Sequence, residues 1–126
     1  MMEINRADVL GEVTDIFYRY ETALVTNDLQ TLDELFWNSA HTIRYGLAED
    51  LYGFAEIQNF RRGRSPLSLA RTLRRTVITT FGSDFATAST EFIRPPHERL
   101  GRQMQTWARF PQGWRVVAAH VSFIAA

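Results

Sequence analysis

Apolar residues recur at intervals of three and four along the first third of the chain, the pattern of a helix with one buried face. Glu12, Asp15 and Arg19 fall on the opposite side of that helix. Asn5 stands where an N-cap is expected, so the pattern predicts that the helix begins there. Asp28 is expected to cap a second, shorter helix. The apolar positions of the two helices are Val9, Val13, Ile16, Phe17, Tyr20 and Leu24, then Leu32, Leu35 and Phe36.

The second half of the chain changes to an alternation of apolar and polar residues, which is typical of strands with one buried face. A third helix is predicted at residues 53–64, because Ile57 and Phe60 give it an apolar face and Pro66 follows it. Helices followed by a meander indicate an α+β fold, with a strongly bent antiparallel sheet covered on one face by three N-terminal helices. The predicted strands are residues 69–81, 85–94, 99–110 and 114–124, and the turns between them are residues 82–84, 95–98 and 111–113.

A short strand pattern at residues 40–46 carries one arginine, Arg44, among apolar and aromatic neighbours. Arginine stays charged in a folded protein, so an inward Arg44 needs a carboxylate, a set of acceptors or an anionic ligand. Alternation places Thr42 and Arg44 on one face and Ile43 and Tyr45 on the other, and the sequence leaves open which face is inward. The segment is a first indication of an anion-binding pocket.

The composition narrows the chemistry that this chain can perform. All 14 basic residues are arginine, and they balance 14 acidic residues. The absence of lysine excludes Schiff-base catalysis and a lysine base, and the absence of cysteine excludes disulfides and thiol nucleophiles. A formal net charge of zero argues against nucleic acid or an anionic membrane as the main partner. The length of 126 residues predicts one domain over residues 1–126.

Two further expectations concern cofactors and location. His41, His97 and His120 lie far apart without the spacing of metal ligands, so we expect no metal. The chain has no glycine-rich phosphate loop, and we expect no cofactor. Neither a signal-peptide pattern nor a membrane-length apolar run occurs, which predicts a cytoplasmic protein.

Short motifs spread along the chain combine aromatic, charged and glycine residues in a specific order. They are Tyr18-Arg19-Tyr20-Glu21, Asn27-Asp28, Leu35-Phe36-Trp37, Arg44-Tyr45-Gly46, Tyr52-Gly53, Phe60-Arg61, Thr90-Glu91-Phe92, Gly101-Arg102-Gln103 and His120-Val121-Ser122. Taken together, they resemble the HpxZ/AtzH-type family of small proteins of oxalurate and cyanuric acid catabolism. The order of elements and the last predicted strand also resemble the wider ketosteroid-isomerase-like or SnoaL-like superfamily, whose conical sheet wraps a pocket closed by the first helix.

This resemblance implies a cofactor-free decarboxylating amidohydrolase that acts on a small N-carboxylated urea such as 1,3-dicarboxyurea. It also implies a catalytic tyrosine and arginine, and these positions match Tyr20 and Arg44. A phenol beside a cation can relay a proton. From the residues alone, Tyr20 could also be a core tyrosine whose hydroxyl meets a backbone carbonyl. The alternative function is a non-catalytic binding or accessory protein of oxalurate and ureide catabolism, since one fold can host many functions.

Three charged or titratable residues are further candidates for binding the small anionic substrate. Arg61 lies in a basic run at residues 61–64, which could guide an anion or form a solvated face. Glu91 could be a base or the counter-ion of Arg44. His120 is expected to share a strand face with Val116, and it could be a general base or a structural histidine.

Gln105 is the remaining candidate substrate contact, and it alternates with Gln103 and Trp107 on one strand. If this row faces inward it suits a polar ligand, whereas an outward row suits a contact between two sheets. Three short helices can cover only one face of the sheet, so we expect the other face to meet a partner. A homodimer or higher homo-oligomer is predicted, with the glutamine row and Trp107 or Trp114 as candidate contacts.

Overall fold

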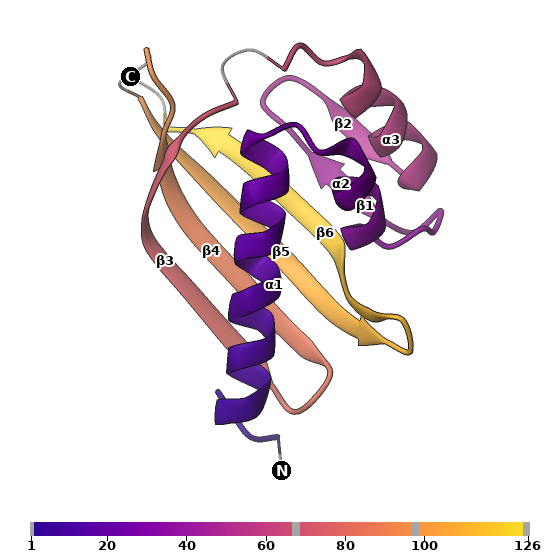
Figure 1. Ribbon diagram of the computed structural model, residues 1–126, viewed down its shortest axis with the longest axis vertical. Coiled ribbons are helices and arrows are strands. Elements are labelled where there is room, and N and C mark those ends of the chain that lie inside the picture. The colour runs from indigo at the N-terminus through magenta and orange to yellow at the C-terminus, as the bar shows by residue number, and fades with distance from the viewer. Residues whose placement is uncertain (1, 67–68, 97–98, 125–126) are drawn as a thin grey trace.

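The computed structural model describes residues 2–66, 69–96 and 99–124. Within these ranges, three helices and two short strands precede four long strands (Figure 1). This order confirms the predicted α+β layout, with element ends within a few residues of the predicted ones. The elements are α1 (Ala7–Val25), α2 (Leu29–Leu35), β1 (Ile43–Tyr45), β2 (Asp50–Tyr52), α3 (Phe54–Gly63), β3 (Thr72–Phe81), β4 (Phe85–Ile93), β5 (Leu100–Phe110) and β6 (Gly113–Phe123).

The strands form one six-stranded sheet in the order β2-β1-β6-β5-β4-β3. The four long strands pair as consecutive antiparallel neighbours, as the alternation predicted. Of the predicted turn at residues 95–98, positions 97 and 98 lie outside the described residues. β1 differs from the long strands because it runs parallel to β6, and β2 pairs antiparallel with its other edge. A parallel pair needs a long connection, and here the chain from β2 to β5 provides it.

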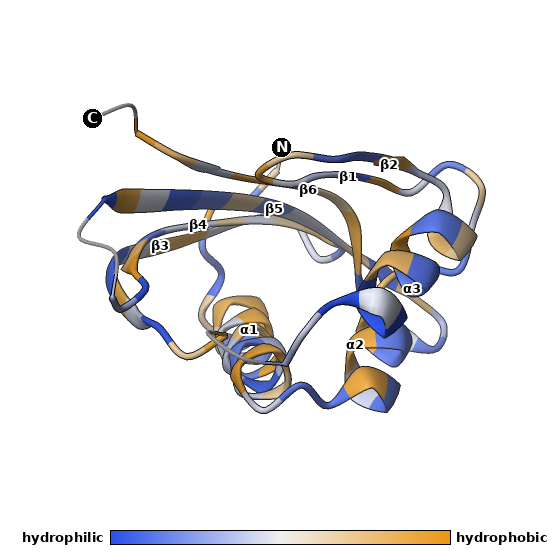
Figure 2. Ribbon diagram, turned by 90° about the horizontal axis from the view of Figure 1, so that it is seen from above, coloured by the Kyte–Doolittle hydropathy of each residue, from blue (hydrophilic) through white to orange (hydrophobic). Residues whose placement is uncertain are grey.

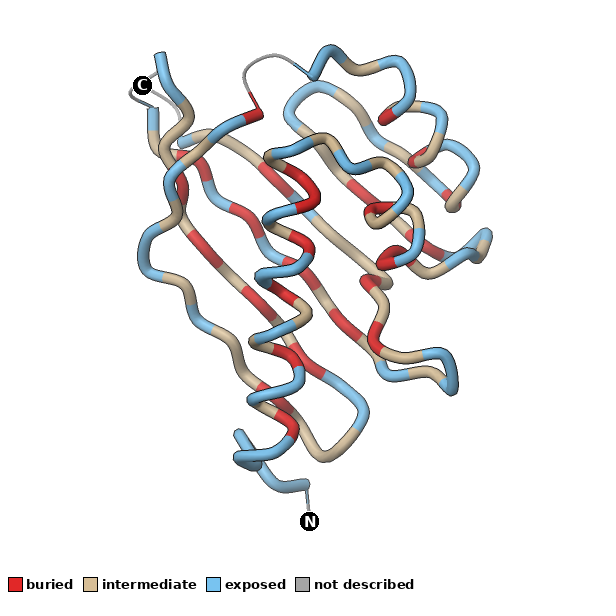
Figure 3. Tube along the Cα trace, in the orientation of Figure 1, coloured by how far each residue is buried: buried red, intermediate tan, exposed pale blue. Residues whose placement is uncertain are grey.

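All three helices lie against the same face of the sheet, and the opposite face is uncovered (Figure 2). Phe17 of α1 and Leu32 and Leu35 of α2 are almost fully buried, and they belong to one core cluster with Trp107 and Val116 of the sheet. Each such side chain stabilises the fold by about 1.5–3 kcal/mol. Buried and exposed stretches alternate along α1 and along the long strands (Figure 3). No helix in the described part of the chain is long and apolar enough to cross a membrane.

The helix starts match the prediction at α2 but not at α1. Arg6, and not Asn5, occupies the position before α1. Asn5 instead joins the N-terminal segment to β3: its backbone N–H donates to the Thr80 carbonyl at 3.0 Å, and its side-chain oxygen accepts from the Thr80 N–H at 2.9 Å. Asp28 caps α2 as predicted, because its carboxylate accepts the Thr31 backbone N–H at 3.2 Å.

A β-bulge in β6 exchanges the two faces of that strand. The pairing of β5 with β6 shifts by one residue between Thr106 and Trp107, which leaves Val117 as an extra residue. Because side chains alternate along a strand, one extra residue moves every later side chain to the other face. Val116 is fully buried on the helix side, but His120 is exposed on the outer side. The expectation that these two residues share a face is therefore wrong.

Candidate active site

A small cavity lies between α1, β1 and the helix-facing side of β5 and β6. Its volume is about 20 Å³, which is room for about one water molecule. A larger molecule therefore has to displace side chains of the cavity wall. The side chains that matter for the chemistry are Tyr20, Arg44, Arg64, Arg71, Arg94 and Gln105.

Tyr20 projects from the buried face of α1 and is 4% exposed. Its ring packs edge-on against Trp107, at 6.4 Å between ring centroids, and lies 6.1 Å from the Phe36 ring. No hydrogen bond joins its hydroxyl to another residue in the described ranges. Buried tyrosine hydroxyls usually have a partner. Because the Tyr20 hydroxyl borders a cavity and has no such partner, it is available to hydrogen-bond a ligand.

The structure resolves which face of β1 is inward, the point that the sequence left open. Thr42 is fully buried and Arg44 is 9% exposed, whereas Tyr45 leaves the strand on the other side. Arg44 Nη1 donates to Glu49 Oε1 at 3.0 Å, and the guanidinium carbon lies 5.3 Å from the centre of the Phe60 ring. Arg44 therefore has the carboxylate partner that an inward arginine needs, and this partner engages only one of its nitrogens.

Gly46 makes the Arg44–Glu49 ion pair sterically possible. A Cβ atom at position 46 would overlap the Glu49 carboxylate and lie 2.9 Å from Arg44 Nη1. The turn after β1 therefore brings Glu49 back onto Arg44 only because residue 46 has no side chain. This explains the Arg44-Tyr45-Gly46 motif in physical terms.

Arg71 is a second paired arginine of the cavity. Its Nε and Nη2 donate to the two oxygens of Glu21, at 2.9 and 2.6 Å, and Nη2 also donates to Gln103 at 2.9 Å. The fork geometry fixes both side chains, because two parallel bonds leave little freedom. Glu21 follows Tyr20 on α1, so this pair ties the helix to the segment before β3.

Three more arginines have no carboxylate partner among the described residues: Arg64 and Arg94 of the cavity wall, and the buried Arg61. Burial lowers the pKa of Arg61 to about 10, with Tyr20 opposing this change and Arg44 adding to it. Burial also lowers the pKa of Arg64 and of Arg94, and neighbouring arginines lower both further. The site therefore carries excess positive charge, which suits an anionic ligand.

The glutamine row faces the helices, so it is part of the cavity and not of an intersubunit contact. Gln105 is almost fully buried, and its Oε1 accepts the Trp107 Nε1–H at 3.1 Å. Its Nε2 has no acceptor within the described ranges and borders the cavity. The expectation that Trp107, Trp114 or the glutamines form a dimer contact is wrong, because these side chains are buried within one chain. Gln105 offers a free N–H donor to a bound molecule.

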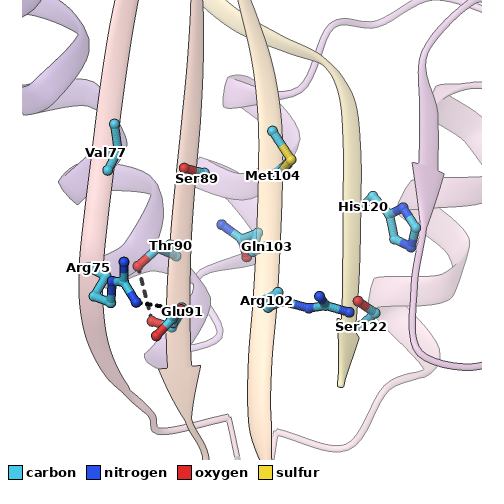
Figure 4. A pocket seen from close by; sticks show the side chains of 10 residues that line it. All are labelled: Arg75, Val77, Ser89, Thr90, Glu91, Arg102, Gln103, Met104, His120 and Ser122. Atoms are coloured by element: carbon cyan, nitrogen blue, oxygen red, sulfur yellow. Dashed lines mark hydrogen bonds and ion pairs between the residues drawn. The ribbon is translucent and has the colours of Figure 1, made fainter. Parts of the chain in front are cut away.

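Glu91 and His120 lie on the outer face, along a groove of about 480 Å³ (Figure 4). Glu91 pairs with Arg74 at 3.0 Å and lies 3.8 Å from Arg75. It is therefore not the counter-ion of Arg44, because the sheet separates the two. His120 also borders the inner cavity, but its position in β6 is on the outer side of the sheet, and its ring packs edge-on against Tyr45 at 5.8 Å between ring centroids.

Arg61 is neither a solvated residue nor part of the cavity wall. It is 2% exposed, and its guanidinium carbon lies 4.1 Å from the centre of the Phe36 ring. Its Nη1 donates to the Leu32 carbonyl at 3.5 Å, while Nε and Nη2 have no acceptor among the described residues. Arg61 acts on the cavity through its charge, since Tyr20 and Arg44 are among the groups that change its pKa.

Sequence reasoning missed Glu21, Glu49, Arg64, Arg71 and Arg94. Glu21 stands beside Tyr20 in a motif, and the exclusive use of arginine was a signal for planar anion contacts. Nothing in the sequence indicated which arginines converge. The residues that the structure describes contain no group of three histidine or acidic side chains that could hold a metal ion.

Comparisons with known proteins agree with this fold. The sequence model of the AtzH-like family matches residues 2–126. A search of curated proteins found no match. A crystal structure of a protein of unknown function from Pectobacterium atrosepticum shares 57% identity with a TM-score of 0.96, and the match covers 97% of this chain and 95% of that one.

Two other solved structures are also similar to this chain. A cystatin-like fold protein from Burkholderia xenovorans shares 50% identity with a TM-score of 0.95, over 100% of this chain and 99% of that one. A nuclear transport factor 2-like protein from Salmonella enterica shares 25% identity with a TM-score of 0.75, over 95% and 94%. These likenesses confirm the ketosteroid-isomerase-like fold predicted from the sequence.

Proposed function

Since this chain belongs to the AtzH-like family, we propose that it is a cofactor-free decarboxylating amidohydrolase of small N-carboxylated ureas such as 1,3-dicarboxyurea, in cyanuric acid and urea-type nitrogen catabolism. The observation that supports the proposal is the position of the unpaired Tyr20 hydroxyl and Arg44 on one cavity with an excess of arginines. An N-carboxylated urea supplies both partners that this cavity lacks: carboxylate oxygens for guanidinium groups, and a nitrogen that must gain a proton.

In the proposed reaction, Arg44 binds the carboxylate that is removed and holds it in a fixed plane. The bond between the carboxyl carbon and the urea nitrogen breaks, and its electron pair goes to the nitrogen. Tyr20 donates its proton to that nitrogen, and the carboxylate leaves as carbon dioxide. A urea with one carboxylate fewer remains, and a proton from solvent restores the tyrosine. A positioned proton donor contributes about 10²–10⁴-fold to the rate, because an unprotonated nitrogen is a poor leaving group.

The test is product analysis of purified protein incubated with 1,3-dicarboxyurea in the presence of a chelator. Release of carbon dioxide above the spontaneous rate, with monocarboxyurea as the other product, is the expected result. Tyr18→Phe is the matched control, because Tyr18 lies on the exposed side of α1 and should leave the rate unchanged. Saturable binding without product would refute catalysis and favour the binding or accessory alternative.

A further inference from the structure

We propose that Arg64 and Arg94 form a second anion subsite, which binds the carboxylate that the substrate keeps. The inference rests on the proposed function for the identity of the substrate, but the subsite follows from the cavity itself. It makes the site selective for small molecules with two negative charges, one held by Arg44 and the other by Arg64 and Arg94.

Arg64 and Arg94 reach the same cavity from two different elements. Arg64 directly follows α3, and Arg94 directly follows β4. The Arg64 guanidinium lies 5.8 Å from the centre of the Phe60 ring, and that of Arg94 lies 5.5 Å from the centre of the Phe92 ring. The aromatic rings hold the guanidinium planes without neutralising them. Both cations are therefore positioned by aromatic contacts, which leave hydrogen-bond donors of each guanidinium free.

The donors of these two arginines are buried and unsatisfied. Nε and Nη2 of Arg64 and Nε of Arg94 have no acceptor in the part of the chain that the structure describes. Buried polar groups are nearly always hydrogen-bonded, and an orphan group in a native structure calls for an explanation. A carboxylate offers enough lone pairs to accept from both arginines at once.

The charge balance of the arginines that line the cavity indicates the number of negative charges that we expect of the ligand. Glu49 offsets Arg44, and Glu21 offsets Arg71. Arg64 and Arg94 remain unbalanced, and each is among the groups that lower the pKa of the other or of its neighbours. A ligand with a single carboxylate on Arg44 would leave this pair uncompensated. A dianion compensates it.

The experiment compares two stable probes of equal length, glutarate with two charges and glutaramate with one, by titration calorimetry at low ionic strength. The wild type should bind glutarate at least about tenfold more tightly, since close charge pairs have large coupling energies. Arg64→Gln and Arg94→Gln should each reduce glutarate affinity by about tenfold and change glutaramate affinity little. Arg62→Gln is the matched control, because Arg62 is exposed in the last turn of α3, two residues before Arg64.

The proposal is overturned if the wild type shows no preference, if it binds neither probe, or if both variants weaken the two probes equally. Thermal unfolding of each variant verifies that it folds. The outcome is independent of turnover: a preference for glutarate without release of carbon dioxide from dicarboxyurea would refute the proposed function and keep the subsite. Turnover of dicarboxyurea without a preference for glutarate would refute the subsite and keep the proposed function.

Discussion

Replacing Arg61 by methionine should stabilise the protein, although it removes a nearly fully buried side chain. Burial lowers the pKa of Arg61 from its ordinary value to about 10, which corresponds to about 3 kcal/mol of destabilisation of the charged form. The contact with the Phe36 ring offsets roughly 1–2 kcal/mol. Methionine fills a similar volume without charge. We therefore expect the free energy of unfolding at pH 7 to rise by about 1–2 kcal/mol.

The assay is urea denaturation followed by tryptophan fluorescence, with Arg62→Met as the exposed control that should change stability by less than about 0.5 kcal/mol. The stability difference between the wild type and Arg61→Met depends on pH in a definite direction. Below pH 10 the buried charge destabilises the wild type in full. Above pH 10 the native state releases a proton that the unfolded chain keeps, so wild-type stability rises and the difference from Arg61→Met becomes smaller. A loss of more than about 1 kcal/mol in Arg61→Met would show that the folded protein compensates this charge, and would refute the reasoning.

Three other perturbations test the site and the uncovered face. Tyr20→Phe should lower turnover by about a hundredfold or more while changing the unfolding free energy by only about 1 kcal/mol, measured on one preparation; turnover at the wild-type rate would remove Tyr20 from the mechanism. Arg44→Lys should largely abolish turnover although it keeps the charge, because a lysine cannot form a fork with a carboxylate; an unchanged rate and Michaelis constant would contradict this role. We also expect a homodimer through the outer face, where Met104 is 59% and Val77 57% exposed. Light scattering should show a dimer for the wild type and a monomer for Met104→Glu. A wild-type monomer at micromolar concentration would rule out this dimer.

The fold was predictable because its elements depend on local patterns. The period of apolar residues located α1, and the carboxylate of Asp28 marked the start of α2. The start of α1 was missed because Asn5 has a competing partner, Thr80, which is 75 residues away along the chain. Local capping rules cannot rank such a long-range contact. The parallel pairing of β1 with β6 is also a long-range contact that local patterns do not predict, since most of the chain separates the two strands.

The site was predictable only for the residues that the family resemblance identified. In a three-residue strand, the alternation of side chains does not show which face is inward. The burial of Thr42 and Arg44 in the folded chain decides it. Its counter-ion was missed because Glu49 returns to it through a turn that Gly46 permits. His120 was placed on the wrong face because alternation was continued through residue 117, where the structure has an extra residue.

That extra residue makes the chemistry of the cavity depend on strand register as well as on side-chain identity. Ala119 lies opposite Arg44 in the register of β1 and β6. If Val117 were paired in a regular strand without the bulge, Ala119 would turn outward and His120 would face the cavity. A neutral methyl group would then give way to an imidazole, which can accept or donate a proton near neutral pH. The bulge therefore excludes a titratable side chain from the cavity through the path of the backbone alone, without any change of sequence.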